Sequence, residues 1–280
     1  MRLIADGGST KVDWCLVGAE GLVKRVFSKG ANPIFRDTAD ISAELKEVLT
    51  PEMAGYTIDS VHFYGAGCAL PEKIETVRLA IADALSLDTS KIEVGSDMLG
   101  AAIGMFGNKP GIACIIGTGS NSCYYDGEKI TANVSPGGFI LGDEGSGAVL
   151  GRLFIGAVIK NQFPEEVKAR FFDFIGITYP EIIEKVYRQP LPNKFLASVS
   201  PFIKENLNNE AVYNMVYNSF ADFFKRNVMQ YEYKGNKVSI IGSVAYHYED
   251  VLKKAAADLG VEIGVIAQSP MDGMIAHFKK

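Results

Sequence analysis

The alternation of apolar and polar positions divides the chain into short strands and longer helices, in an order that occurs twice. Apolar runs separated by tight, glycine-containing turns are typical of consecutive strands, and leucine and valine at helical spacing predict helices. The first part is expected to contain strands 2–6, 11–17 and 22–28, helix 37–49, strand 61–64, helix 71–85, strand 92–94 and helix 97–105.

The same order begins again after Gly107–Gly111, a segment with the composition of a linker. This repeated order predicts two domains, 1–107 and 108–268. It leaves open that a C-terminal helix at 269–280 packs back on the first domain. The second part is expected to contain strands 112–116, 122–126 and 129–133, helices 146–160, 165–174, 179–187, 194–206 and 210–231 within an insertion of about 145–231, strand 238–241, helix 248–259, strand 261–266 and helix 270–278.

Composition narrows the class of protein. The 280 residues are 48% apolar and 22% charged, which is ordinary for a globular chain long enough for two domains. A net charge of −5 without any basic cluster argues against a nucleic-acid surface, because phosphate backbones are held mainly by Lys and Arg. The sequence shows neither an export signal nor an uninterrupted apolar run of 18 residues, so we expect a cytoplasmic protein.

Cysteine and histidine give no sign of a metal or redox site. The four cysteines are scattered without any CxxC pair, so buried free thiols in a reducing compartment are expected. The three histidines, His62, His247 and His277, share no metal-like spacing.

Two glycine-rich segments, Asp6–Lys11 and Gly117–Asn121, each join an apolar strand to a second strand. Either one alone is an ordinary hairpin turn. Together they suggest a pair of loops whose amides and hydroxyls bind a polyphosphate. Asp6–Lys11 is not a Walker loop, since Thr10 stands where that motif needs a glycine before Lys11. A dinucleotide fingerprint is disfavoured because Gly117–Ser122 and Gly65–Leu70 lack its final glycine or alanine.

Two further features carry candidate chemistry. Asp97 follows a predicted strand and opens a helix, so it is either a helix cap or first-turn carboxylate, or a ligand-binding carboxylate at the end of a strand. The segment Pro136–Gly147 holds five glycines, more backbone freedom than a helix cap needs, which favours a functional loop.

These segments resemble the actin/hexokinase/Hsp70-type ATPase superfamily. Within it, Gly117–Asn121, Gly142–Ser146, Gly30–Pro33 and Ser96-Asp97 are similar to the N-acetylglucosamine kinase branch, which is grouped with the BadF/BadG-type ATPases. The resemblance implies an α/β fold of duplicated ribonuclease H-like (actin-like ATPase) domains, each a mixed five-stranded sheet flanked by helices, with a cleft between them. One difference lies in the segment Pro136–Phe139. The animal kinase carries a tryptophan between its two glycines there, and this chain does not.

The resemblance also implies roles for particular residues. Asp97 is the expected catalytic carboxylate, which receives the proton of the sugar hydroxyl. Asp6 is expected to hold Mg²⁺, through water. The expected ATP-binding residues are Gly7, Gly8, Ser9, Thr10, Lys11, Gly117, Thr118, Gly119, Ser120, Gly242, Ser243 and Val244, and the expected sugar-binding residues are Asn32, Asp97, Gly137, Gly138 and Asp143.

The expected activity is ATP-dependent phosphorylation of N-acetylglucosamine or a related amino sugar, at the 6-hydroxyl, with ATP and Mg²⁺ as cofactors. The expected partner is the sugar, without nucleic acid or membrane, and a homodimer stays open. The alternatives are a BadF-type ATPase that drives conformational change in a partner protein and a sugar sensor without turnover. The scattered cysteines offer no grouping for the iron–sulfur cluster of BadF-type activators.

Overall fold

The computed structural model describes residues 1–8 and 10–279. It divides into two compact units. Unit 1 consists of Met1–Pro110, Asp126–Lys129 and Pro270–Lys280, and unit 2 of Gly111–Tyr125 and Ile130–Ser269.

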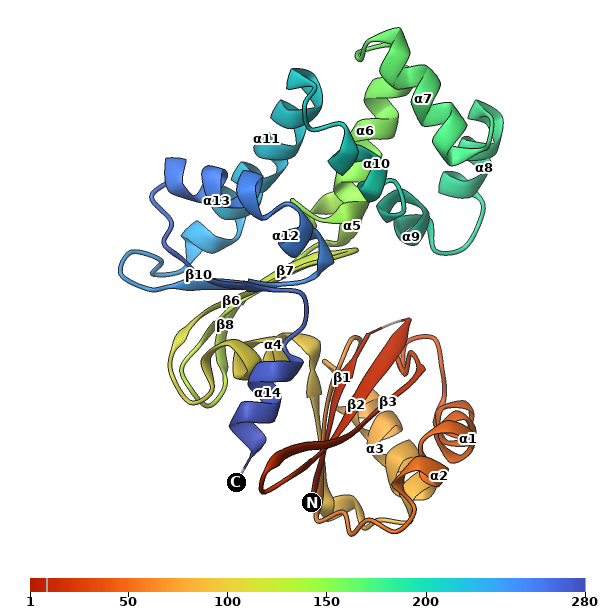
Figure 1. The fold of residues 1–280 in the computed structure, drawn as a ribbon, viewed down its shortest axis with the longest axis vertical. Helices are drawn as coiled ribbons and strands as arrows, with labels where there is room; N and C mark the ends of the chain where they lie inside the picture. Colours follow the sequence, from red (N-terminus) through yellow and green to blue (C-terminus); the bar gives the residue numbers. More distant parts are fainter. Residues whose placement is uncertain (9, 280) are drawn as a thin grey trace. The chain divides into compact units, whose positions relative to one another are not determined.

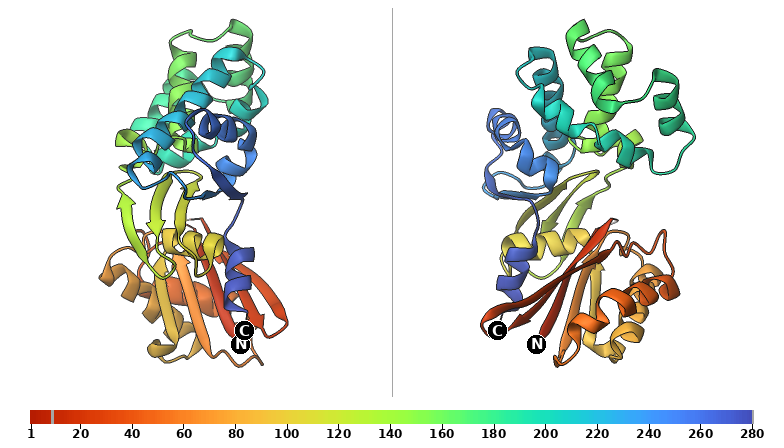
Figure 2. Two further views of the ribbon diagram at one scale, coloured as in Figure 1. Left: turned by 90° about the vertical axis from the view of Figure 1, so that its left-hand side faces the viewer. Right: turned by 45° about the vertical axis from the view of Figure 1, so that its right-hand side comes forward.

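Unit 1 is built on a five-stranded sheet of order β3-β2-β1-β4-β5, in which β1 is antiparallel to β2 and parallel to β4. Helices α1, α2 and α3 lie on one side of this sheet, and α4 and α14 lie on the other (Figures 1 and 2). The elements are β1 (Arg2–Gly7), β2 (Lys11–Gly18), β3 (Gly21–Lys29), α1 (Thr38–Val48), α2 (Thr50–Met53), β4 (Ser60–Gly65), α3 (Pro71–Leu85), the 3-10 turn η1 (Thr89–Lys91), β5 (Ile92–Ser96), α4 (Asp97–Phe106) and α14 (Met271–Phe278).

Two glycines allow α4 and α14 to pack closely. A Cβ on Gly273 would lie 1.7 Å from the carbonyl oxygen of Gly104, and a Cβ on Gly104 would meet Pro270 at 2.6 Å. The C-terminal helix therefore packs on the same layer as α4, although about 160 residues separate the two in the sequence.

Unit 2 repeats the arrangement, with sheet order β10-β9-β6-β7-β8. Most of its helices gather on one side of this sheet, where they enclose a large apolar core (Figure 1). The elements are β6 (Gly111–Ile116), β7 (Ser120–Tyr125), β8 (Ile130–Val134), α5 (Gly138–Leu141), α6 (Gly147–Ile159), α7 (Glu165–Ile175), α8 (Tyr179–Tyr187), α9 (Pro192–Ala197), α10 (Ser200–Glu205), α11 (Glu210–Arg226), η2 (Val228–Gln230), β9 (Val238–Ile241), α12 (Ser243–His247), α13 (Glu249–Asp258) and β10 (Ile263–Ala267).

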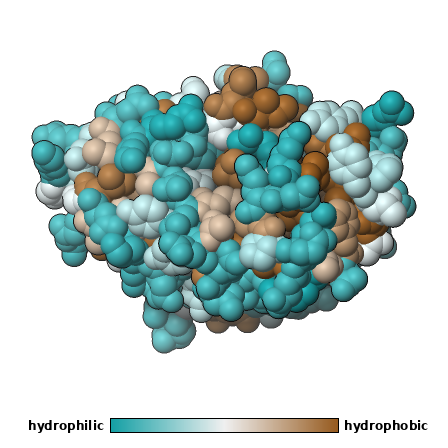
Figure 3. Space-filling model, turned by 90° about the horizontal axis from the view of Figure 1, so that it is seen from above, coloured by the Kyte–Doolittle hydropathy of each residue, from teal (hydrophilic) through white to brown (hydrophobic). Residues whose placement is uncertain are grey.

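The outer surface mixes residue types. In Figure 3 hydrophilic side chains predominate, and smaller apolar patches lie between them. Single exposed apolar side chains, such as Tyr187 at 76% exposure, are usual on folded proteins. Among the described residues, no helix is both long and apolar enough to cross a membrane.

The predicted pair of mixed five-stranded sheets with flanking helices is confirmed. One local prediction is wrong: residues 194–206 form two helices, α9 and α10, instead of one. The predicted helix 248–259 is present as α13 and is preceded by a separate short helix, α12. The glycine-rich segment contains a helical turn, α5, because Gly137 and Gly138 at φ of 75° and 69° turn the chain into it.

Candidate functional site

The carboxyl ends of three parallel strands meet at one edge of the unit 1 sheet. Gly7 of β1 lies opposite Gly65 of β4, which lies opposite Ser96 of β5. Neighbouring strands are about 4.8 Å apart, so the β1–β2 turn and the start of α4 lie within roughly 10 Å of each other. This is the edge at which open α/β sheets bind their ligands.

Asp97 is the first residue of α4 and does not cap it. The cap is Ser96, whose hydroxyl accepts a hydrogen bond from the Leu99 amide at 3.2 Å. The Asp97 carboxylate accepts from the Met98 amide at 2.8 Å. Burial raises the pKa of Asp97 above its ordinary value, opposed by hydrogen bonds from the amides of Met98 and Asp97 itself. The cap interpretation is therefore wrong, and the first-turn carboxylate is present.

Asn32 is buried at 7% exposure and lies against the segment that follows β4. A Cβ on Gly67 would be 2.3 Å from the Asn32 side-chain oxygen, which also accepts from the Ile34 amide at 3.0 Å. The charge of Asp97 contributes to raising the pKa of Cys68, so Asp97 faces the same segment. Unit 1 thus gathers Asn32 and Asp97 around residues 65–68.

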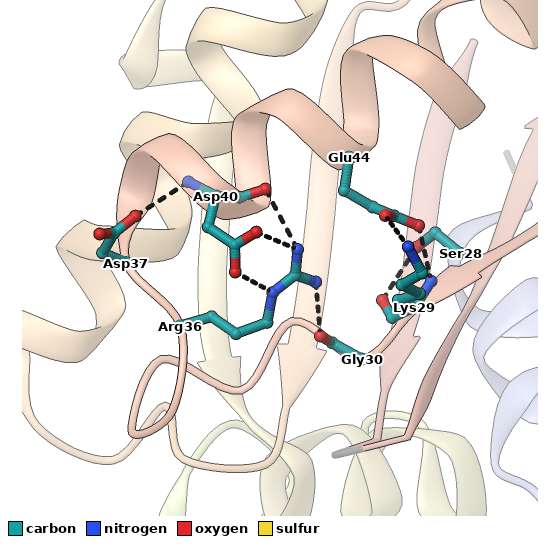
Figure 4. Close-up of polar contacts among 7 residues, drawn as sticks. All are labelled: Ser28, Lys29, Gly30, Arg36, Asp37, Asp40 and Glu44. Atoms are coloured by element: carbon teal, nitrogen blue, oxygen red, sulfur yellow. Dashed lines mark hydrogen bonds and ion pairs between the residues drawn. The ribbon is translucent and has the colours of Figure 1, made fainter.

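Hydrogen bonds and an ion pair connect the turn that carries Asn32 to helix α1 (Figure 4). Arg36 donates to the Gly30 carbonyl at 2.8 Å and forms a bidentate ion pair with the Asp40 carboxylate, with N–O distances of 2.6 and 3.0 Å. Glu44 accepts from the Lys29 amide at 3.2 Å. The turn is therefore fixed to α1 at both ends, which holds Asn32 in place.

The β1–β2 turn presents fewer donors than the sequence suggests. The Gly8 amide donates to the Lys11 carbonyl at 2.9 Å, which closes the hairpin. The Lys11 ammonium lies 4.8 Å from the centre of the Phe27 ring. Asp6 is the penultimate residue of β1, and Thr10 is exposed. Ser9, one of the expected ATP-binding residues, lies outside the described residues.

The β6–β7 turn of unit 2 is bonded to the first turn of α6. The Gly147 amide donates to the Gly117 carbonyl at 2.8 Å, and the Ala148 amide donates to the Thr118 carbonyl at 3.1 Å. A Cβ on Gly242 would lie 2.3 Å from the Ile116 carbonyl oxygen. The expected second phosphate loop and the loop after β9 are therefore in contact.

Asp143 joins the glycine-rich segment to the same turn. Its carboxylate accepts from the Ser120 amide at 3.2 Å, and its own amide donates to the Pro136 carbonyl at 2.9 Å. The latter bond closes the loop that carries Gly137 and Gly138. Burial raises the pKa of Asp143, the Ser120 amide opposes that shift, and the neighbouring charge of Glu144 adds to it.

A pocket of about 580 Å³ opens beside this turn. Its lining includes the two expected nucleotide segments, Gly117-Thr118 and Ser243-Val244. Residues of α9, α10 and the end of α12 form another wall. The lining residues are Gly117, Thr118, Ala197, Ser198, Ser200, Pro201, Lys204, Glu205, Ser243, Val244, His247 and Tyr248. Its size is in the range of small-molecule sites.

Sequence reasoning missed the wall formed by Ala197–Glu205 and the pocket position of His247. The predicted unbroken helix at 194–206 concealed the break near Ser198, which turns that stretch toward the pocket. Pro201, a residue favoured in the first turn of a helix, was the available signal for a new helix start.

The four cysteines are free and buried, as expected. Burial raises the pKa of the Cys15 and Cys123 thiols to about 12, which leaves them protonated and unreactive at neutral pH. Among residues 1–8 and 10–279, no group of three or more His, Cys, Asp or Glu side chains is arranged to hold a metal ion.

Solved structures match the whole chain, whereas no protein-family model and no curated protein does. A structure named "putative N-acetylglucosamine kinase" from Porphyromonas gingivalis is 47% identical, with a TM-score of 0.95, over 100% of this chain and 99% of the other. One of the same name from Chromobacterium violaceum has a TM-score of 0.74 at 16% identity, over 99% and 98%.

A glucokinase of the ROK family from Streptomyces griseus shares the fold, with a TM-score of 0.55 at 16% identity over 98% and 97% of the two chains. The likeness to the Porphyromonas protein extends over the full length and far exceeds what a shared fold requires. The chain therefore belongs to the N-acetylglucosamine kinase/BadF-BadG-type ATPase family of the actin/hexokinase/Hsp70-like superfamily, and it is an enzyme of the sugar-kinase class.

Proposed function

We propose that this enzyme transfers the γ-phosphoryl group of ATP to the 6-hydroxyl of N-acetylglucosamine or a related amino sugar. The observation that carries the proposal is Asp97, a partly buried carboxylate at the carboxyl edge of the unit 1 sheet whose helix is capped by another residue. Its helix therefore does not need it as a cap. A carboxylate with a raised pKa at this place is suited to accept a hydroxyl proton.

We assign the nucleotide to unit 2. The pocket beside Gly117-Thr118 has the volume for a nucleoside, and the exposed hydroxyls of Thr118 and Ser243 lie on its rim. A Cβ on Gly117 would meet no atom within 4 Å, so a phosphate can approach the backbone there. The Streptomyces griseus glucokinase of the same fold was solved with glucose and AMPPNP.

We assign Asn32 and Asp97 of unit 1 to sugar binding. Within unit 2, Gly137, Gly138 and Asp143 are separately proposed as sugar contacts. Buried amide and carboxylate groups suit sugar hydroxyls, because a hydroxyl left unpaired in a closed site costs about 1–3 kcal/mol. Asn32 is held rigidly by its turn, and Asp143 by Ser120 and Pro136. Relatives of this fold carry names that include glucokinase and N-acetylmannosamine kinase, so the choice among sugars needs a direct test.

Mg²⁺ would be held by Asp6 through water, together with the ATP phosphates. A single carboxylate at the end of β1 fits this ion, which usually keeps several waters and rarely occupies an all-protein cage. When bound, Mg²⁺ neutralises charge on the phosphates. The chain itself aligns the hydroxyl with Asp97, which takes its proton, and presents the Gly117–Ser120 backbone and Thr10 to the nucleotide.

The test is ADP release measured over a panel of glucosamine, N-acetylglucosamine, N-acetylmannosamine, glucose and N-acetylmuramic acid, with product position determined by NMR. We expect Mg-dependent turnover that is highest with an N-acetylated amino sugar and a phosphate on the 6-oxygen. Turnover equal to that of the sugar-free control throughout the panel would contradict the proposal.

A further inference from the structure

Glu144 is a buried charged residue in the Gly142–Ser146 motif to which no role has yet been assigned. It is 8% exposed. One carboxylate oxygen is ion-paired with Arg226, and the other accepts from the Asn227 side-chain amide at 3.0 Å. Both partners lie at the carboxyl end of α11, more than 80 residues away in sequence.

The backbone around Glu144 is attached to the expected phosphate loop. The Ser120 hydroxyl donates to the Glu144 carbonyl at 2.8 Å, and the Ser120 amide donates to the Asp143 carboxylate at 3.2 Å. The next residue, Gly145, donates its amide to the Ser219 hydroxyl of α11 at 3.1 Å. Side-chain anchors on α11 therefore hold the motif, and the motif in turn contacts Ser120 through two bonds.

We infer that Glu144 is a positioning residue, whose carboxylate anchors the motif to α11 and thereby sets Asp143 and Ser120 in the geometry needed for phosphoryl transfer. The inference rests on the proposed function and adds to it a coupling between the sugar-side carboxylate and the nucleotide loop. A buried carboxylate is costly unless paired, so loss of its partner should disturb the segment that carries it.

The chain supplies a matched control in the other unit. Asp13 is 6% exposed and paired with Arg25 of the neighbouring strand, and it lies opposite Asp6 in the sheet of unit 1, whereas segments 117–121 and 142–148 belong to unit 2. Arg25 and Arg226 are both substantially exposed, at 40% and 61%. Replacing either by Met removes the partner of a buried carboxylate without opening a large cavity, so both variants should fold.

The experiment compares Arg226→Met with Arg25→Met in kinetics and thermal unfolding. We expect both to lower the unfolding temperature, and Arg226→Met to lower kcat/KM by about 10- to 100-fold, with KM rising for both sugar and ATP. Arg226→Lys, which keeps the charge, should recover most of the loss. Wild-type values of kcat/KM and of both KM in Arg226→Met would overturn the inference and leave Glu144 a structural residue.

Amide hydrogen exchange separates this inference from the proposed function, because it needs no turnover. We expect Arg226→Met to speed exchange in segments 117–121 and 142–148, and Arg25→Met to leave both unchanged. Faster exchange in Arg226→Met than in wild type, where the wild-type protein phosphorylates no sugar, would support the anchor and contradict the proposed function. Unchanged exchange and kinetics in an active enzyme would contradict the anchor alone.

Discussion

Each unit joins its first two strands through a glycine-containing segment, and the first glycine of each segment has a different environment. A Cβ on Gly7 would lie 2.6 Å from the buried ring of Phe63, so glycine is required there by packing. A Cβ on Gly117 would meet nothing within 4 Å, beside a pocket that Gly117 and Thr118 line. A glycine in this sequence pattern therefore meets the packed core in unit 1 and open space beside a pocket in unit 2.

The carboxylates of the two units differ in a related way. Asp97 accepts from the amide of Met98 on its own helix, and the helix is capped by Ser96. Asp143 accepts from Ser120, which belongs to the hairpin turn itself. The hydrogen bond of the Asp97 carboxylate thus stays within its own helix, whereas a change at Asp143 must also disturb the turn.

The largest expected effect comes from Asp97→Asn. Loss of a positioned base should lower kcat by about 10²–10⁴-fold, with sugar and nucleotide binding retained in calorimetry. Ser96→Ala is the matched control, because it should cost about 1 kcal/mol of stability as a lost cap and leave kcat nearly unchanged. If Asp97→Asn keeps kcat within about threefold of wild type, Asp97 is not the base.

The glycine comparison is tested by Gly7→Ala and Gly117→Ala. The first should destabilise the fold by about 1–3 kcal/mol in urea unfolding, since the new methyl group overlaps Phe63. The second should leave stability unchanged and raise the KM for ATP by about tenfold, equivalent to about 1.4 kcal/mol of binding. Equal stability losses in the two variants would remove the distinction between the turns.

The two sugar-side residues should respond differently to truncation. Asn32→Ala should raise the KM for sugar by about tenfold with the KM for ATP unchanged, as one lost hydrogen bond predicts. Asp143→Ala should raise both KM values, because its carboxylate also holds the Ser120 amide. A rise confined to the sugar KM in both variants would show that the Asp143–Ser120 bond has no part in nucleotide binding.

The smallest effect is a pH dependence of stability. Burial raises the folded-state pKa of both Asp97 and Asp143, so their ionised forms cost stability at neutral pH. Asp97→Asn and Asp143→Asn should therefore each unfold at a slightly higher temperature than wild type at pH 7. The gain should disappear as pH falls below about 4, where the unfolded carboxyl is also protonated. A difference that is constant with pH would exclude desolvation as its cause.

The sequence alone determined the elements of the fold and their duplication, because apolar periodicity and turn residues act over a few neighbours. Helices Pro71–Leu85 and Tyr179–Tyr187 coincide with their predicted ranges. Asp97 and the glycine-rich segments could be singled out in the same way, and the resemblance to sugar kinases rested on such local motifs.

Tertiary structure decided what those motifs do. Whether a glycine is required by Phe63 or open to a ligand depends on a residue more than fifty positions away. The pocket wall at Ala197–Glu205 and the Arg226 and Asn227 anchors of Glu144 come from segments in which no local signal indicates what they contact. Burial and pairing are properties of space rather than of sequence neighbourhood, so these contacts exist only once distant helices and strands have packed together.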